Sequence, residues 1–172
     1  MDVPANPHQE LVWRLFSVLT PFVNEKTDEI YPGVNVSDRD DWKSDYRIPD
    51  VAAYLFGDPA ENRRTHCLGG PDLAVENVSR NDRTDQKLDF HTAVGTRELI
   101  VIDRSDERLE LHRLIDGTLT RVGTLTTDSG PITTESVPLP WLMKRADQLQ
   151  LILTGSAATG SVIIEVVDSV VE

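Results

Sequence analysis

The stretch Leu73-Ala-Val-Glu-Asn-Val78 decides the fold, because it is a short apolar run with one acid, Glu76, inside it. Residues 83–94 then have the composition of a helix, which we expect to end at Gly95 because glycine commonly terminates helices. Residues 98–102 form a second, nearly continuous apolar run. Strand, helix and strand in this order indicate a βαβ unit, in which helices cover a buried sheet. The sequence therefore predicts an α/β fold.

Further elements are predicted on both sides of this unit. They are a helix at about 7–19, a strand at 48–56, a polar loop at 61–70, a hairpin at 109–115 and 118–122, and additional C-terminal strands at about 148–168. Asn6 and Asp82 are the expected N-caps of the two helices. A chain of 172 residues is long enough for one sizeable core, so we expect a single domain that spans residues 1–172.

The balance of charges limits the range of functions. A formal net charge of −12 argues against a protein that coats nucleic acid, because non-specific affinity comes from Lys and Arg that neutralise phosphates. A nuclease tolerates this charge if its acids gather around a metal and its basic residues are concentrated locally. Arg80, Arg83 and Lys87 form such a cluster, although a solvated surface is the simpler interpretation of these charges.

The sequence also bears on the compartment. No stretch approaches the roughly 18 consecutive apolar residues of a membrane helix, and residues 1–10 lack the basic and apolar segments of a secretory signal. The single cysteine, Cys67, has no partner for an internal disulfide, which fits a reducing compartment. We therefore expect a cytoplasmic protein without membrane contact.

Asp50, Glu76 and Lys87 are the candidate catalytic residues. Asp50 starts one predicted strand, Glu76 lies inside the next, and Lys87 lies on the helix that follows. A glutamate in a buried strand is costly unless it is paired or bound to a cation. If the two strands are neighbours, the carboxylates converge and provide hard oxygen ligands for Mg²⁺ or Mn²⁺. The alternative is that Asp50 caps a turn, Glu76 pairs with an arginine and Lys87 lies at the surface.

Four blocks of sequence carry a family resemblance. In chain order they are Tyr46-Arg-Ile-Pro-Asp-Val51, Gly70-Pro-Asp-Leu-Ala-Val-Glu-Asn-Val-Ser79, Asp85-Gln-Lys-Leu88 and Val94-Gly-Thr-Arg-Glu-Leu-Ile-Val-Ile-Asp103. Together they resemble the Uma2 (DUF820) family of restriction endonuclease-like proteins, which belongs to the PD-(D/E)XK nuclease superfamily. The resemblance covers about residues 33–122, and the order of the blocks makes it more specific than any one of them.

The resemblance implies a nuclease-like core with a mixed β-sheet flanked by helices. The proline-aspartate pair of the superfamily matches Pro49 and Asp50, and its second acid matches Glu76. The superfamily usually places its lysine two residues after the second acid, where this chain has Val78. In proteins that resemble this one the next helix supplies the lysine, and Lys87 occupies that place.

Three other residues are secondary candidates. Asp72 repeats the proline-aspartate pair four residues before Glu76, so it is either a further metal or structural contact or an acid that bonds local backbone. Glu10 is a candidate for a supporting acidic role that some superfamily members place on the first helix, although an exposed glutamate is the simpler interpretation. His91 either faces the same cleft as Lys87 or packs on the flank of its helix.

The predicted function is that of a metal-dependent endonuclease that hydrolyses phosphodiester bonds in nucleic acid, with DNA favoured as the substrate. Asp50 and Glu76 would bind Mg²⁺ or Mn²⁺, and Lys87 would assist. The alternative is a nuclease-like interaction or regulatory module that no longer cuts, which the acidic surface and the displaced lysine favour. A hydrolase of small phosphate esters is a weaker alternative. A homodimer formed through the apolar strand at 162–167 is a further hypothesis.

Overall fold

A computed structural model describes residues 7–78, 83–154 and 161–166. Its largest sheet has six strands in the order β1-β3-β6-β7-β8-β9. These strands are Glu29–Tyr31 (β1), Val51–Tyr54 (β3), Leu73–Val78 (β6), Glu98–Asp103 (β7), Arg108–Ile115 (β8) and Thr118–Leu125 (β9). β6 and β7 are parallel, and every other pair of neighbours is antiparallel. The sheet is therefore mixed, as predicted.

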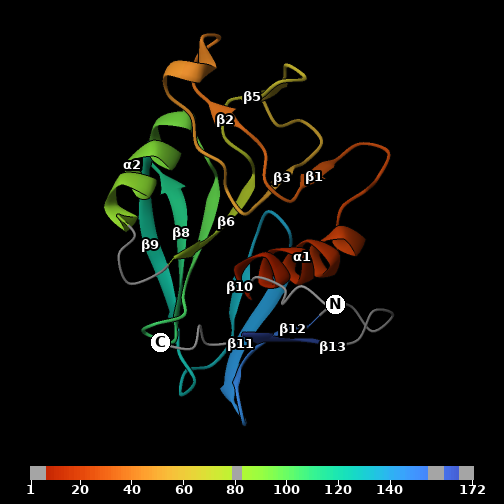
Figure 1. Cartoon of the computed structure of the whole chain (residues 1–172), viewed down its shortest axis with the longest axis vertical. Coiled ribbons are helices and arrows are strands. Elements are labelled where there is room, and N and C mark those ends of the chain that lie inside the picture. Colours follow the sequence, from red (N-terminus) through yellow and green to blue (C-terminus); the bar gives the residue numbers. More distant parts are fainter. Residues whose placement is uncertain (1–6, 79–82, 155–160, 167–172) are drawn as a thin grey trace, which may run out of the picture.

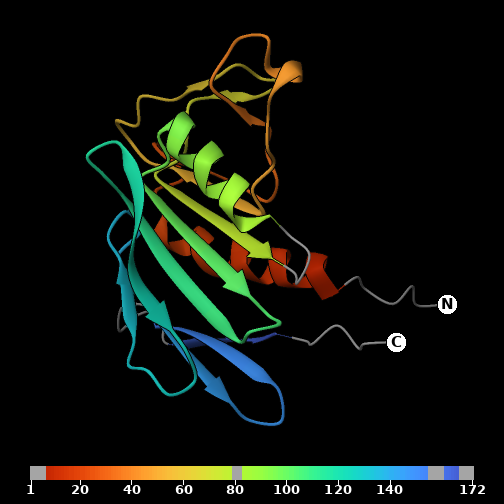
Figure 2. The ribbon, with the colours of Figure 1, turned by 90° about the vertical axis from the view of Figure 1, so that its left-hand side faces the viewer.

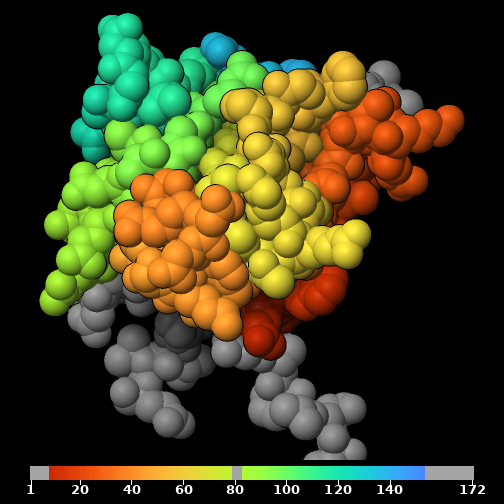
Figure 3. Space-filling view, turned by 90° about the horizontal axis from the view of Figure 1, so that it is seen from above, coloured from red at the N-terminus to blue at the C-terminus, as the bar shows by residue number. Residues whose placement is uncertain are grey.

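Two smaller sheets lie at opposite ends of the molecule (Figure 1). The first is antiparallel and consists of Ile132–Thr134 (β10), Leu139–Arg145 (β11), Leu149–Thr154 (β12) and Ser161–Val166 (β13). The second joins Val36–Ser37 (β2), Cys67–Leu68 (β5) and Glu61–Asn62 (β4). Seen from the end that carries this second sheet, the orange and yellow segments with β2, β4 and β5 form one continuous surface (Figure 3).

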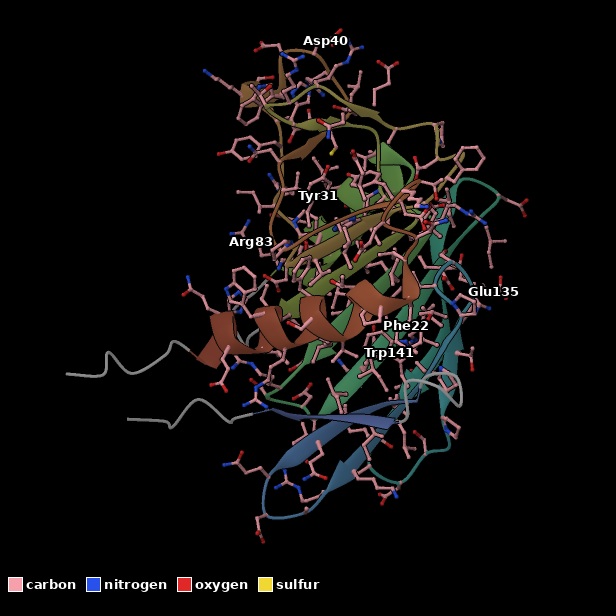
Figure 4. All side chains as sticks on the ribbon, turned by 90° about the vertical axis from the view of Figure 1, so that its right-hand side faces the viewer. Phe22, Tyr31, Asp40, Arg83, Glu135 and Trp141 are labelled. Carbon is pink, nitrogen blue, oxygen red and sulfur yellow. The ribbon has the colours of Figure 1, made fainter. Side chains whose placement is uncertain are left out.

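Two helices cover opposite faces of the large sheet (Figure 2). Pro7–Leu19 (α1) packs on one face together with the four-stranded sheet, and Thr84–Val94 (α2) packs on the other. Phe22 and Trp141 lie in the layer between α1 and the four-stranded sheet (Figure 4). Trp141 is fully buried there, and removing so large a side chain would cost about 3–5 kcal/mol. One apolar core thus fixes α1 against both sheets.

The alternation of side chains along β6 sets up the two faces. Leu73 and Val75 belong to the core under α1, whereas Ala74 and Val78 pack on the α2 side. Successive side chains of a strand point to opposite faces, so Glu76 also belongs to the α2 side. A buried acid is thereby placed under the helix that carries Lys87.

The helix ends agree closely with the sequence patterns. α1 has the predicted bounds. α2 begins at Thr84, one residue later than predicted, and Arg83 in the N-cap position makes no side-chain capping bond. Gly95 ends α2 with a left-handed conformation, φ 82°, which glycine adopts without steric cost. The expected N-caps Asn6 and Asp82 lie outside the described residues.

Several strands differ from the predictions. The strand predicted at 48–56 is shorter, Val51–Tyr54, and the loop predicted at 61–70 contains β4 and β5. β1, β10 and β11 were not predicted. In β11, Leu139, Trp141 and Met143 are buried in alternation, but the prolines at 138 and 140 obscure this period because proline is rare inside strands.

The remaining general predictions concern membranes and assembly. In the described part of the chain, no helix is long and apolar enough to cross a membrane. β13 is an edge strand of the four-stranded sheet, which is the position that a strand-mediated dimer requires. The homodimer, the single-domain organisation and the cytoplasmic location stay predictions.

Candidate active site

The pairing of β3 with β6 brings Asp50 near Glu76. The antiparallel register ends by matching Val51 with Val75, and Asp50 is the residue just before β3. The Asp50 carbonyl accepts a hydrogen bond from the Gly33 N–H at 3.1 Å. The two strands are therefore neighbours, and Asp50 lies close enough to Glu76 for the charge of Glu76 to act on it.

Glu76 is held by two side chains from α2. Lys87 Nζ donates to Glu76 Oε2 at 2.7 Å, and His91 Nε2 lies 3.2 Å from Glu76 Oε1. Lys87 and His91 are four residues apart, so they occupy the same face of the helix. The Glu76 residue is only 4% exposed. Both carboxylate oxygens of this buried acid thus have a nitrogen partner.

These partners control the ionisation of Glu76. Burial alone would raise the pKa of Glu76, but the hydrogen bond with His91 and the charge of Lys87 outweigh burial and lower the pKa below its ordinary value. The carboxylate therefore stays ionised at neutral pH, which is the state that a metal ligand or a salt bridge requires.

Asp50 lies at the more open side of the pair. Its side chain is 13% exposed against 5% for that of Glu76. Oδ2 accepts the backbone N–H of Asn77 at 2.7 Å, and Oδ1 lies 3.0 Å from His8 Nε2. Burial raises the pKa of Asp50 and the negative charge of Glu76 adds to this rise, while the Asn77 hydrogen bond, His8 and Lys87 oppose it. The two acids are therefore close enough to influence each other electrostatically.

Sequence reasoning did not single out His8 or Asn77. His8 is in the first turn of α1, and its Nδ1 lies 3.0 Å from Asn77 Nδ2. Asn77 Oδ1 is buried and has no hydrogen-bond partner among the described residues. The first turn of α1 and the first turn of α2 thus lie at the same end of the large sheet. In Figure 4 the label Arg83 marks the start of α2. No local pattern marks His8, because its contact depends on how α1 docks.

A second layer of contacts fixes His91. His91 is fully buried, and its Nδ1 lies 2.9 Å from Thr96 Oγ1. Thr96 in turn packs on Gly70, where an added Cβ would lie 2.5 Å from the Thr96 backbone nitrogen. Of the two alternatives for His91, the structure therefore shows contact with the Lys87 and Glu76 cluster, from a packed position on the helix.

Asp72 lies at the opposite end of β6. Its Oδ1 accepts a hydrogen bond from Arg97, and its Oδ2 accepts the backbone N–H of Leu55, both at 2.8 Å. Its carbonyl accepts the Ser136 hydroxyl at 3.0 Å. Figure 4 shows that Glu135, the neighbour of Ser136, lies at the far end of the sheet from Arg83. Asp72 is thus not brought together with Asp50 and Glu76, and its contacts join loops.

The other charged candidates are mostly paired elsewhere. Glu10 bonds Arg14 one turn along α1, and no described contact joins it to Asp50 or Glu76. Arg97, Arg108 and Arg113 form ion pairs with acids. Arg80 lies outside the described residues.

The donor chemistry of the site fits a hard divalent cation. Mg²⁺ is usually held by one or two carboxylates and keeps several waters, and Asp50 with Glu76 meets this need. The unpartnered Asn77 Oδ1 is a further oxygen beside them. In the described part of the chain, however, no group of three His, Cys, Asp or Glu residues is arranged to hold a metal. The protein would therefore have to share the ion with water or substrate.

The fold has a counterpart among solved structures. A "putative nuclease belonging to DUF820" from Anabaena variabilis ATCC 29413 has a TM-score of 0.58 and 14% sequence identity, over 80% of this chain and 76% of that chain. At this identity the likeness shows a shared fold. The fold is therefore that of the nuclease-like α/β class.

The family follows from the sequence. The pattern of the Uma2 family, described as "Putative restriction endonuclease", matches residues 1–144. The chain therefore belongs to the Uma2 family, which the four sequence blocks had indicated. No relative was found among the curated proteins.

Proposed function

We propose that the chain is a metal-dependent endonuclease that hydrolyses phosphodiester bonds, with DNA as its preferred substrate. The observation that carries the proposal is the pair of acids Asp50 and Glu76. Asp50 directly precedes β3, Glu76 lies on the neighbouring strand β6, and Lys87 is bonded to Glu76. This order of acid, acid and lysine matches the residues that the family resemblance selects. The nuclease-like fold is consistent with it.

Asp50 and Glu76 would hold Mg²⁺ or Mn²⁺. When bound, such an ion acts as a Lewis acid that activates water and stabilises negative charge on the phosphoryl oxygens. The lowered pKa of Glu76 keeps one ligand anionic at neutral pH. Asp50 is positioned by the Asn77 N–H, so that its remaining oxygen faces His8. The protein thus orients both oxygen donors before any ion arrives.

Lys87 contributes a fixed positive charge. Its side chain is 24% exposed while Nζ bonds Glu76. A cation at this place would stabilise the charge that develops on a phosphate or would orient the attacking water. The His8 side chain, which is 41% exposed, lies beside Asp50.

The second candidate is a nuclease-like module that no longer cuts. One observation favours it: Lys87 and His91 occupy both oxygens of Glu76, so an ion must compete with them. The net charge of −12 also opposes tight binding to nucleic acid. Calorimetric titration with Mn²⁺ separates the two candidates, since the module should show no binding up to millimolar concentrations.

The direct test is cleavage. Purified protein is incubated with plasmid and with single-stranded DNA, in Mg²⁺, in Mn²⁺ and in EDTA, alongside Asp50→Ala and Glu76→Ala. Glu10→Ala is the matched control, because Glu10 is an acid whose described partner is Arg14 and not a residue of the pair. We expect cutting by the wild type and the control in metal only, and none by the two variants. Equal trace activity in all four proteins would refute the proposal.

A further inference from the structure

A hollow of about 260 Å³ opens directly beside Asp50. His8 and Trp13 of α1 line one wall, and Ile48 and Pro49 line the other. Trp13 is 58% exposed and Ile48 is 54% exposed. An active-site acid thus adjoins two large apolar side chains that remain in contact with water.

Trp13 offers an aromatic surface beside the acid. Its aromatic partner among the described residues is Phe16, which it meets edge to face with ring centroids 5.8 Å apart. The exposed indole of Trp13 is a flat aromatic surface, which is well suited to stack on another flat ring. Nucleobases are such rings, and every base has a face for stacking.

A second hollow of about 260 Å³ adjoins the first, because Gly33 and Ile48 line both. His66 lines this second hollow and is 5% exposed. Its Nδ1 lies 3.1 Å from Thr65 Oγ1, while its Nε2 is buried without a hydrogen-bond partner in the described part of the chain. A buried polar atom without a partner costs free energy, and a ligand that bonds it would recover that cost.

The two hollows are less acidic than the chain as a whole, whose formal net charge is −12. Of the described residues that line them, Asp50 alone is acidic, Arg64 is a cation, and His8 and His66 contribute imidazole rings. Arg64 is exposed and forms no ion pair with another described residue, whereas its neighbour Arg63 pairs with Glu61 and Asp40. A second copy of a chain with net charge −12 is a poor occupant. A strand of phosphates is a better one.

We propose that the two hollows form one groove that binds unpaired, single-stranded DNA, with a base stacked on Trp13 beside Asp50 and a neighbouring nucleotide at His66 and Arg64. This inference rests on the proposed nuclease function, because it names the form of substrate that this site accepts. Stacking on Trp13 requires a base that is free of its duplex. The groove therefore selects single strands, or unpaired segments, over intact duplex.

The experiment measures binding without cleavage. Fluorescence anisotropy in EDTA follows a short labelled thymidine oligonucleotide, its duplex and the uridine equivalent, with wild-type protein, Trp13→Ala, Trp13→Phe and Arg64→Ala. Two matched controls accompany them. Phe56→Ala removes an aromatic side chain that is 82% exposed outside both hollows, and Arg63→Ala removes the paired arginine.

We expect the wild type to bind the thymidine strand more tightly than the duplex. Trp13→Ala should weaken this binding about 5- to 150-fold, the range of base–aromatic stacking, and Trp13→Phe should restore most of it. Arg64→Ala should reduce the slope of log affinity against log salt by about 0.7, the value for one phosphate contact of a single strand. Both controls should bind like the wild type.

Three results would overturn the proposal. The first is that Trp13→Ala and Phe56→Ala bind the thymidine strand with equal affinity, and the second is that the wild type prefers the duplex or the uridine strand. The third is that the wild type sediments as a dimer and Trp13→Ala as a monomer. The last result would show that the hollow is an interface between copies of the chain. Failure of the nuclease function is distinguishable, because the protein would then bind single strands through Trp13 without cutting them in Mg²⁺ or Mn²⁺. Duplex cutting that is unaffected by Trp13→Ala would instead refute the groove alone.

Discussion

The two ends of β6 carry buried acids in contrasting surroundings. At the start of the strand, Asp72 bonds a backbone N–H and the guanidinium of Arg97, which stays charged at all ordinary pH values. At the end of the strand, Glu76 bonds Lys87 and His91, and its neighbour Asp50 bonds His8. The partners of Asp72 are thus a loop backbone and an arginine, whereas the side-chain partners of Glu76 and Asp50 are lysine and histidine on two helices.

This difference distinguishes a structural acid from a candidate catalytic acid. The contacts of Asp72 tie the segment after β3 to the sheet, since the N–H that it binds belongs to Leu55. Within the described part of the chain, the side-chain contacts of Glu76 go to α2. A divalent cation at Glu76 would therefore compete with a lysine and a histidine of one helix, and not with contacts that join loops to the sheet. Both acids are buried to a similar degree, so burial alone does not identify the site.

The largest expected effect separates the two ends by activity. Glu76→Gln keeps the shape of the side chain but removes the charge that would hold a metal, so we expect cleavage to fall by about 10³-fold or more. Asp72→Asn should leave cleavage within a few-fold of the wild type. Both are measured by single-turnover cleavage in Mn²⁺, with circular dichroism to check folding. If Asp72→Asn loses as much activity as Glu76→Gln, the contrast between the ends is wrong.

The next effect concerns His91. His91→Ala removes a partner that lowers the pKa of Glu76, so we expect metal affinity to fall roughly 10- to 100-fold, as for other groups that orient a ligand. The acidic limb of the activity profile should also move to higher pH, because Glu76 would protonate more easily. His91→Gln should restore part of both. An unshifted pH profile with intact folding would show that His91 only packs.

A smaller effect is expected on stability at the other end. Asp72→Ala leaves the Leu55 N–H without its acceptor, so the free energy of unfolding should fall by roughly 2 kcal/mol. Urea denaturation measures this change, with Glu10→Ala as a control that should remain within about 0.5 kcal/mol of the wild type. No loss in Asp72→Ala would mean that water satisfies the N–H and that Asp72 is free for another role.

The sequence predicted those parts of the fold whose sequence patterns lie within a single segment. Helical spacing at 7–19 and the apolar run at 73–78 gave elements with the observed bounds, because periodicity and end residues lie within each segment. β1 is only three residues long and is defined by its pairing with β3. A strand of that kind is specified by its partner, which a single segment does not reveal.

The candidate site followed the same rule. The cost of burying Glu76 was visible in its own strand, and the family resemblance selected Asp50 and Lys87. The placement of Asp72 was not visible, because its partners Leu55 and Arg97 come from separate elements. His8 joins the site only through the docking of α1 on the sheet. Residues recruited by tertiary packing thus lay beyond sequence reasoning.

The smallest expected effect is a pH dependence near Asp72. Burial first, and then a hydrogen bond with Asp72, raise the pKa of Asp58 from 3.8 to about 6. Folding therefore favours the protonated form, so this contribution to stability is complete below about pH 4 and is lost as the pH rises through about 6. Asparagine stays neutral at every pH, so Asp58→Asn should not show this loss of stability. The difference in the free energy of unfolding should be less than about 1 kcal/mol, because the group is partly exposed. Urea denaturation on either side of pH 6 tests it, and identical curves for both proteins would contradict it.

The close approach of Gly70 to Thr96 has a consequence for how the chain can vary among its homologues. Any side chain at position 70 would push on Thr96, the residue that bonds the buried ring of His91. The two nearest backbone atoms are the Thr96 nitrogen and Cα, at 2.5 and 2.9 Å, so a smaller residue at position 96 would not relieve the contact. Homologues that keep this backbone path should therefore keep a glycine at position 70, whichever residue stands at position 91.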